Sequence, residues 1–162
     1  MNLQGQSSMF KIVISVLGRA LLSVIFILAG LNKILNWGSS EHVLMQAVVS
    51  ARAHMGFPFI DAALQMMQQH VGLCLVLATM AELLGGLLVF LGMFVRFGAF
   101  LLVMYLIPTT FLFHAFWRLT PPESDIQVVM FMKNITIVGG LLVVCAFGSG
   151  FHRFSTSLKN PS

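Results

Sequence analysis

Four long apolar runs divide the chain. Each has about 20 residues or more, the length that an α-helix needs to cross a hydrocarbon core of about 30 Å. Helices are expected because backbone groups in lipid must find hydrogen-bond partners within their own segment. The sequence therefore predicts an all-α membrane protein, a bundle of four transmembrane helices that forms a single domain over residues 1–162. The predicted spans are Ile12–Leu35, Val71–Val95, Phe97–Trp117 and Ile126–Phe147.

The connections between the runs differ in length. Little more than Arg96 separates the second run from the third, which predicts a tight antiparallel hairpin. The third and fourth runs are joined by Arg118–Asp125, which contains Pro121 and Pro122. The first run is too long for the apolar part of a signal peptide, so we expect it to be retained as a span.

The first connection, Asn36–His70, is long enough to hold helices of its own. Ser39 or Ser40 is a suitable N-cap for a short helix over Glu41–His54. We expect this helix to lie in the membrane interface. Pro58 suits the first position of a second helix, which is predicted to continue into the second span.

The charges that flank the four runs predict the orientation of the protein. One side of the membrane would carry only basic residues, and the positive-inside rule places that side in the cytoplasm. An even number of spans then puts both termini in the cytoplasm. The basic side holds Lys11, Arg96, Arg153 and Lys159, and the other side holds Arg52 and Arg118 with Glu41, Asp61, Glu123 and Asp125.

Composition supports a location in the lipid bilayer. Hydrophobic residues make up 58% of the chain and charged residues only 9%, whereas soluble domains carry about 25% charged residues. The net charge of +4 comes from basic residues that are scattered singly, so no nucleic-acid partner is predicted. Cys74 and Cys145 each lie alone in an apolar run, which favours two buried small side chains over a redox pair.

Polar residues inside the predicted spans are the most informative feature. An ionisable side chain at membrane depth is costly unless it is paired or hydrated, so such residues usually face the interior of the bundle. Glu82 lies near the middle of its run, and the depths of Arg19 and Lys133 allow either cation to reach it. The polar residues are Arg19, Asn32, Lys33, Glu82, His114, Gln127, Lys133 and Asn134.

These charges permit two interpretations. If Arg19, Lys33 and Lys133 all face Glu82, the excess positive charge calls for a ligand such as a quinone head group, an oxyanion or a lipid phosphate. Alternatively, Arg19 and Lys33 snorkel to opposite interfaces, which leaves a structural ion pair between Glu82 and Lys133. No metal site is predicted, because His114 has no second histidine three or four residues away.

Several short motifs follow one another from Leu17 to Gly150. They are Leu17-Gly18-Arg19 with Ile25 through Lys33, Glu82-Leu83-Leu84-Gly85-Gly86 with Gly92 and Arg96, Phe113 through Trp117, and Gln127 with Phe131 through Asn134 and Gly139-Gly140-Leu141-Leu142. Together they resemble the DoxX family of small integral membrane proteins. The resemblance implies a four-helix protein of the bacterial inner membrane and a shared polar site made by Arg19, Lys33, Glu82, His114, Lys133 and Asn134.

The resemblance also suggests a function. The family takes its name from similarity to a subunit of a thiosulfate:quinone oxidoreductase, so we expect a subunit or accessory of a membrane redox system whose intramembrane site holds a quinone or a small anion. A membrane or periplasmic oxidoreductase would be its partner, and the chain could form a homo-oligomer. The alternatives are a scaffold or assembly factor without enzymatic activity and, with less support, a small transporter, since no inverted repeat is visible.

Overall fold

The computed structural model describes residues 3–54 and 57–148. Within these residues the chain is helical and contains no strand. The helices are α1 (Leu3–Leu35), α2 (Trp37–His54), α3 (Pro58–Gln69), α4 (Val71–Leu91), α5 (Val95–Phe113), the short 3-10 helix η1 (Phe116–Arg118) and α6 (Glu123–Phe147).

Four segments of the described residues are long and apolar enough to cross a membrane. This confirms the predicted all-α membrane protein with four spans. The segments are Met9–Leu35, Val71–Leu91, Val95–Arg118 and Glu123–Phe147.

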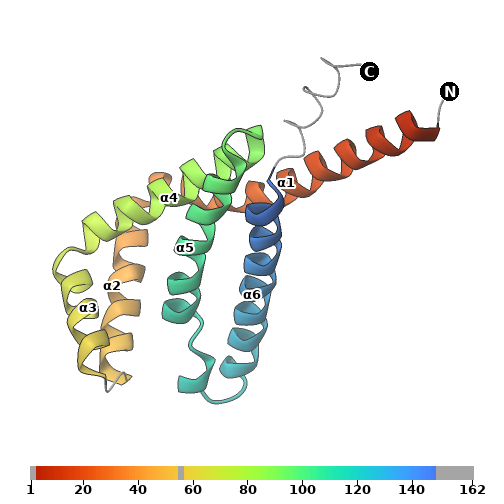
Figure 1. Cartoon of the computed structure of the whole chain (residues 1–162). Coiled ribbons are helices and arrows are strands. Elements are labelled where there is room, and N and C mark those ends of the chain that lie inside the picture. Colours follow the sequence, from red (N-terminus) through yellow and green to blue (C-terminus); the bar gives the residue numbers. More distant parts are fainter. Residues whose placement is uncertain (1–2, 55–56, 149–162) are drawn as a thin grey trace.

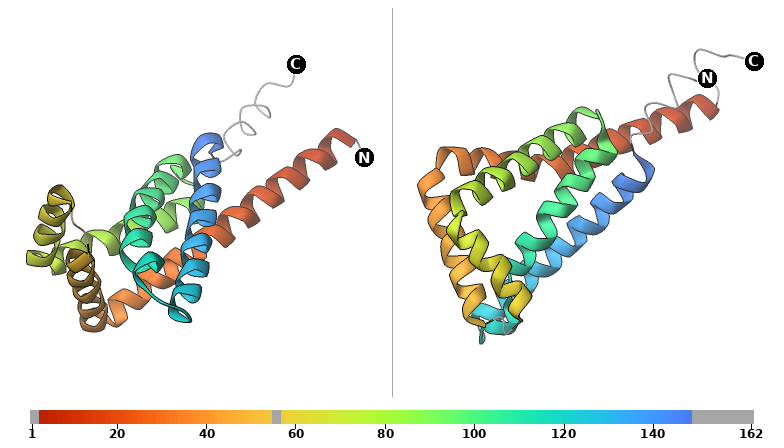
Figure 2. Two further views of the ribbon diagram at one scale, coloured as in Figure 1. Left: turned by 90° about the horizontal axis from the view of Figure 1, so that it is seen from below. Right: turned by 60° about the vertical axis from the view of Figure 1, so that its left-hand side comes forward.

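The helices are arranged as packed pairs (Figure 1). α4 runs alongside α1 in the opposite direction and packs on it, and α5 and α6 form a second antiparallel pair. α2 and α3 form a hairpin that stands beside α5, on the side away from α6. The N-terminal part of α1 extends well beyond the other helices, as the additional views show (Figure 2).

A tight turn joins α4 to α5, as the sequence predicted. Gly92 ends α4 with a left-handed backbone (φ 77°), a conformation that glycine adopts without steric cost. Phe94 follows with φ 46°, and α5 begins at Val95. The turn therefore lies at residues 92–94, and Arg96 belongs to the first turn of α5 rather than to the connection.

The predicted second span extends too far, whereas the predicted third span, Phe97–Trp117, lies within the segment Val95–Arg118 that can cross a membrane. α4 ends at Leu91, and α5 ends at Phe113 because His114 has a non-helical backbone (φ −118°, ψ 42°). Trp117 then lies in η1.

The first connection is helical, as predicted, but its boundaries differ. α2 begins at Trp37, so Ser39 and Ser40 lie in its first turn and not at its cap. The amide and the hydroxyl of Ser40 both donate to the carbonyl of Asn36, the one residue that separates α1 from α2.

The helix that starts at Pro58 stops sooner than predicted. Pro58 occupies the first position of α3, which confirms that prediction. α3 ends at Gln69 and does not continue into the second span, because His70 leaves the helical conformation (φ −123°, ψ 37°). The chain changes direction at His70. α3 therefore packs beside α2, and α4 runs in a different direction from α3.

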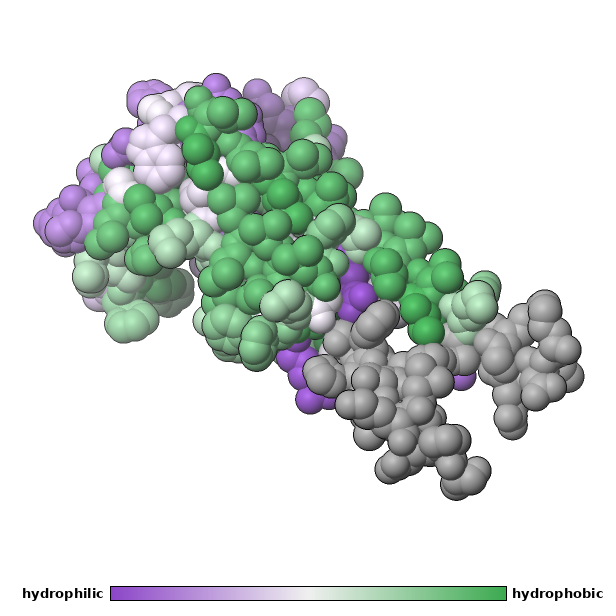
Figure 3. Space-filling view, turned by 90° about the horizontal axis from the view of Figure 1, so that it is seen from above, coloured by the Kyte–Doolittle hydropathy of each residue, from purple (hydrophilic) through white to green (hydrophobic). Residues whose placement is uncertain are grey.

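Two groups of buried apolar residues hold the helices together. One lies between α1, α4, α5 and α6, and the other joins the α2–α3 hairpin to the start of α4. The first comprises Phe26, Val89, Ala99, Leu102, Val103, Leu106, Val138 and Leu141, and the second Leu44, Val48, Ala51, Leu64 and Leu75. Outside these groups, apolar side chains cover most of the surface seen in Figure 3, as expected for a lipid-facing protein.

Glycines allow α4 and α5 to approach closely. A Cβ atom on Gly85 would lie 3.0 Å from the carbonyl oxygen of Gly98, and one on Gly98 would lie 3.0 Å from that of Gly85. Small residues are the usual means by which membrane helices make such contacts. Gly85 and Gly98 therefore serve the packing of α4 on α5.

Arg52 links the two helices of the α2–α3 hairpin. Its Nε donates to Oδ1 of Asp61 at 2.9 Å, and its Nη1 donates to Oε1 of Gln68 at 2.6 Å. The hydrogen bond and the positive charge of Arg52 lower the pKa of Asp61. Both side chains are partly exposed to solvent, so the stabilisation is small.

This contact predicts a pH dependence of the hairpin. Folding lowers the pKa of Asp61. The stabilisation from its contact with Arg52 is therefore complete above the ordinary aspartate pKa of about 3.9, and it is lost as the pH falls through the lowered value. We expect Asp61→Asn to increase amide hydrogen exchange in α2 and α3 at pH 6, and the difference from wild type to shrink as the pH falls below about 3.9. Asp125→Asn is the control, and equal protection of the wild type and Asp61→Asn at pH 6 would contradict the assignment.

Candidate functional site

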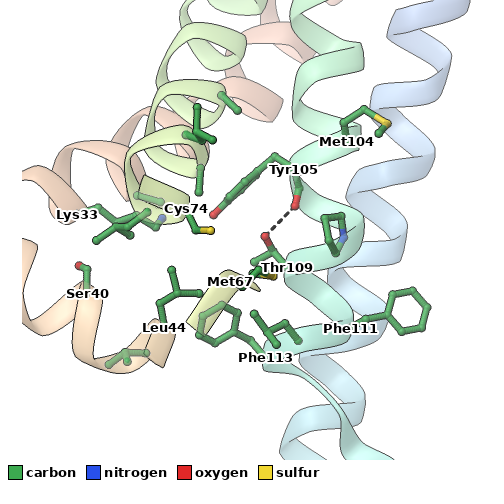
Figure 4. Close-up of a pocket in the computed structure, with 18 of the residues that line it drawn as sticks. Lys33, Ser40, Leu44, Met67, Cys74, Met104, Tyr105, Thr109, Phe111 and Phe113 are labelled. Atoms are coloured by element: carbon green, nitrogen blue, oxygen red, sulfur yellow. Dashed lines mark hydrogen bonds between the residues drawn. The ribbon is translucent and has the colours of Figure 1, made fainter. Parts of the chain in front are cut away.

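A cavity of about 990 Å³ lies between the α2–α3 hairpin and helices α1, α4 and α5. Its walls are mainly apolar, with contributions such as Leu44, Met67 and Met104. Figure 4 shows Lys33 and Ser40 on one side of this space and Tyr105 and Thr109 of α5 facing them. The polar residues of the lining are Asn32, Lys33, Asn36, Ser39, Ser40, Tyr105, Thr109 and His114.

An ion pair lies at the wall of the cavity. Nζ of Lys33 donates to Oε2 of Glu82 at 2.6 Å. The Glu82 side chain is only 3% exposed, whereas that of Lys33 is 23% exposed, and Lys33 rather than Glu82 lines the cavity. The Lys33 ammonium also lies 5.7 Å from the centre of the Tyr105 ring, within the range of a cation–π contact.

Local structure explains why the cation of the pair comes from α1. Lys33 lies in the last turn of α1, where the helix dipole favours a positive charge. The antiparallel packing of α1 on α4 brings this last turn level with Glu82, which is buried in α4. The interpretation in which Lys33 snorkels and Glu82 pairs with Lys133 is therefore wrong, because the partner of Glu82 is Lys33.

Lys133 and Asn134 lie away from the cavity, because α6 packs mainly on α5. The Lys133 side chain is exposed, and its closest polar contact is Sδ of Met130 at 3.5 Å. Asn134 is buried within the bundle. The two residues belong to α6, which contributes nothing to the lining of the cavity.

Arg19 lies at the opposite end of α4 from the cavity. Its side chain is buried, and a Cβ atom on Gly92 would lie 3.3 Å from its Nη1. The guanidinium thus faces the C-terminal end of α4, where the helix dipole favours a cation. Glu82 lies ten residues earlier, about 15 Å away along the helix axis. Arg19 is therefore separate from the Lys33–Glu82 pair.

His114 also lines the cavity, nine residues after Tyr105 and so about 13 Å from it along α5. Its Nδ1 lies 2.7 Å from Oε1 of Gln127, and the amide oxygen can only accept, so Nδ1 carries the proton in this arrangement. The contact joins the end of α5 to α6. Among the described residues, no three His, Cys, Asp or Glu side chains gather in a way that would hold a metal ion.

Of the six predicted site residues, three belong together at this cavity. Lys33 and His114 line it, and Glu82 lies behind Lys33. Lys33 and Glu82 neutralise each other, so the excess of positive charge that we considered does not gather here.

Sequence reasoning missed Tyr105 and Thr109, which complete the cavity. They are four residues apart on α5, and the Thr109 hydroxyl donates to the Tyr105 carbonyl at 2.7 Å (Figure 4). The spacing and the fact that the chain has only one tyrosine were available signals. Cys74 also lines the cavity, whereas Cys145 lies outside it.

Comparison with known proteins identifies the family of this chain. The profile of the DoxX family matches residues 14–115. The chain belongs to the DoxX family. The match covers the cavity from α1 to His114, and α6 lies outside it.

Two curated relatives in Escherichia coli agree with this assignment. The inner membrane protein YqjF is 30% identical over 141 residues, which cover 87% of this chain and 88% of YqjF. The inner membrane protein YphA is 30% identical over 78 residues, or 48% of this chain and 56% of YphA. No solved structure matches the chain.

Glu82 is more deeply buried than Lys33. We therefore expect replacement of Lys33 and replacement of Glu82 to lower the stability of the protein by different amounts. Lys33→Met leaves the Glu82 carboxylate buried without a counter-charge, and such a loss costs about 3–5 kcal/mol. We expect a clear fall in Tm in nanodiscs, a smaller fall for Glu82→Gln, and partial recovery in the double variant. Lys133→Met is the matched control and should leave Tm unchanged. A fall for Lys133→Met as large as that for Lys33→Met would contradict the pairing.

Proposed function

We propose that this DoxX-family protein binds a neutral, membrane-soluble molecule of the quinone class in the cavity, and serves as a subunit or accessory of a membrane redox system. The observation that carries the proposal is the cavity itself. It has about 990 Å³, mainly apolar walls and polar residues contributed by α1, α2 and α5. Ligand sites in proteins generally have this combination of size and lining.

Charge favours a neutral ligand over an anion. Among the described residues, Lys33 is the lysine or arginine that lines the cavity, and it is already paired with Glu82. A bound anion would have to compete with the buried Glu82 carboxylate for the ammonium group. A quinone carbonyl needs only a hydrogen bond, which a lysine paired through one of its three protons can still donate.

The two polar ends suit the shape of such a molecule. Lys33 and Tyr105 lie together at one end, and the ammonium group and the phenol hydroxyl can each donate a hydrogen bond to a carbonyl oxygen. His114 lies at the other end, with its Nδ1 occupied by Gln127. Apolar side chains between these ends, such as Leu77 and Met104, would cover the ring and the start of an isoprenoid tail.

We further propose that the protein lies in the bacterial inner membrane with both termini in the cytoplasm. Both curated relatives are inner membrane proteins by name. The basic Arg96 next to the α4–α5 turn favours the cytoplasmic side for that turn. The α2–α3 hairpin and the cavity would then lie toward the periplasm, where an oxidoreductase partner could receive or deliver the ligand.

The scaffold alternative has less support. A scaffold would need a docking surface, and the long first connection is a candidate, but this segment folds into a hairpin whose residues Leu44, Leu64 and Met67 line the cavity. These side chains are thus turned toward the space that we assign to the ligand, whereas Phe59 and Met66 of α3 remain exposed.

Filling the cavity should remove the ligand without unfolding the protein. Ala78 lines the cavity, so Ala78→Phe would occupy part of it. We expect the protein, purified gently from its native membrane, to carry near-stoichiometric quinone by mass spectrometry, and Ala78→Phe to carry at least tenfold less. Leu84→Phe, at an exposed site of the same helix outside the lining, is the control. Wild-type protein without quinone but with a stoichiometric protein partner would instead support the scaffold reading.

Cys74 offers an independent readout in the same preparation. Added short-chain ubiquinone should slow alkylation of Cys74 by N-ethylmaleimide and leave the rate at Cys145 unchanged, because only Cys74 lines the cavity. Equal rates at Cys74 with and without ubiquinone would contradict binding at this site.

A further inference from the structure

Lys133 is exposed on a membrane-spanning helix without an opposite charge. It lies ten residues from the start of α6, about 15 Å along a helix that must cross a core of about 30 Å. Among the described residues, its one polar contact is the weak acceptor Sδ of Met130. No carboxylate of the described residues lies within 4.0 Å of it. An unpaired lysine that faces lipid at this depth is costly.

The surroundings of Lys133 suit contact with another helix. Residues spaced by three and four along α6 form one exposed face, which we call the outer face of α6. Gly139 on this face has no atom within 4 Å of the position that a Cβ would occupy, so a second backbone could approach there closely. The outer face consists of Val129, Met132, Lys133, Thr136, Gly139 and Val143.

α6 is also the span least covered by the rest of the chain. Only 11% of its most apolar window is buried, against 33% for α4 and for α5 with η1. The hydroxyl of Thr136 donates to the carbonyl of Met132 at 2.9 Å, so Lys133 is the one group of the outer face whose hydrogen-bonding capacity is unmet.

A second copy of the chain does not supply the missing charge. Copies related by an axis along the membrane normal keep every residue at its own depth. Of the acidic residues, Glu82 is buried and paired with Lys33, and Asp61 is paired with Arg52 outside the spans. Glu123 and Asp125 lie at the start of α6, about 12–15 Å from Lys133 along the axis.

The remaining acid, Glu41, is in the α2–α3 hairpin on the other side of the molecule. All five acidic residues of the sequence are thus accounted for. A symmetric contact through this face would moreover bring two Lys133 side chains together.

We propose that the outer face of α6 binds a transmembrane helix of a different protein, and that a carboxylate in the middle of that helix pairs with Lys133. The pair would remove the cost of the exposed lysine and fix the depth of the partner helix. Gly139 would let the two backbones approach. This inference rests on α6 alone and does not depend on a ligand in the cavity.

Photo-crosslinking in the membranes of the native organism tests the proposal. p-Benzoylphenylalanine at Thr136 should form an adduct with one protein, and peptide mapping should place it in a transmembrane span that carries Asp or Glu. The same probe at Met80, an exposed residue near the middle of α4, is the matched control and should react with lipid.

Charge reversal then tests the role of Lys133. We expect Lys133→Glu to reduce the Thr136 adduct by about tenfold, a change of about 1.4 kcal/mol. Replacing the partner's acid with lysine should restore it, and Lys133→Arg should retain it. Unchanged Tm of Lys133→Glu verifies folding. An adduct with a second copy of the chain or with lipid alone would overturn the proposal. A protein adduct whose yield does not change with the charge at residue 133 would also overturn it.

Discussion

The ion pair between Lys33 and Glu82 is the interaction on which the arrangement of the helices depends. A carboxylate as buried as Glu82 cannot be left without a counter-charge, and its loss of a partner is more costly than almost any apolar contact in a bundle of this size. The pair ties the end of α1 to the middle of α4. Because α2 follows directly from α1, the same contact sets where the α2–α3 hairpin begins, and so where the cavity lies.

Charges at the two ends of α4 support this arrangement. Oε1 of Glu41 lies near Gly72 in the first turn of α4, and the Arg19 guanidinium lies near Gly92 at its end. An acid at the N-terminus and a base at the C-terminus each interact favourably with a helix dipole, by about 0.3–1 kcal/mol. α4 therefore meets the continuous α1–α2 segment at three charged positions. Their spacing along α4 leaves little freedom for the two segments to slide past each other.

The sequence allowed the spans to be predicted well and the contacts between them poorly. Apolar runs set the number of crossings, because length and hydrophobicity alone decide whether a helix can span lipid. Which helices touch depends on packing that hydrophobicity does not encode. By depth in the sequence, Arg19 and Lys133 were the reasonable partners for Glu82, and only the antiparallel packing of α1 on α4 brings Lys33 to it instead.

The predicted site shows the same limit. The cost of burying charge correctly identified Glu82 as a residue in need of a partner, and His114 lines the cavity that Lys33 also lines. Arg19, Lys133 and Asn134 were grouped with them because all are polar and lie within spans, yet they lie elsewhere in the fold. Tyr105 and Thr109 escaped notice because a tyrosine and a threonine cost much less in a membrane helix than a charge does.

A direct measurement of the Lys33–Glu82 contact would test this account most simply. Solid-state NMR in lipid bilayers can detect dipolar coupling between ¹⁵N at lysine Nζ and ¹³C at the glutamate carboxyl group. Among the described residues, only Lys33 and Glu82 form a lysine–carboxylate pair. We expect one such coupling, which disappears in Lys33→Met and persists in Lys133→Met. A coupling that persists in Lys33→Met and disappears in Lys133→Met would show that Glu82 faces α6, and would contradict the arrangement described above.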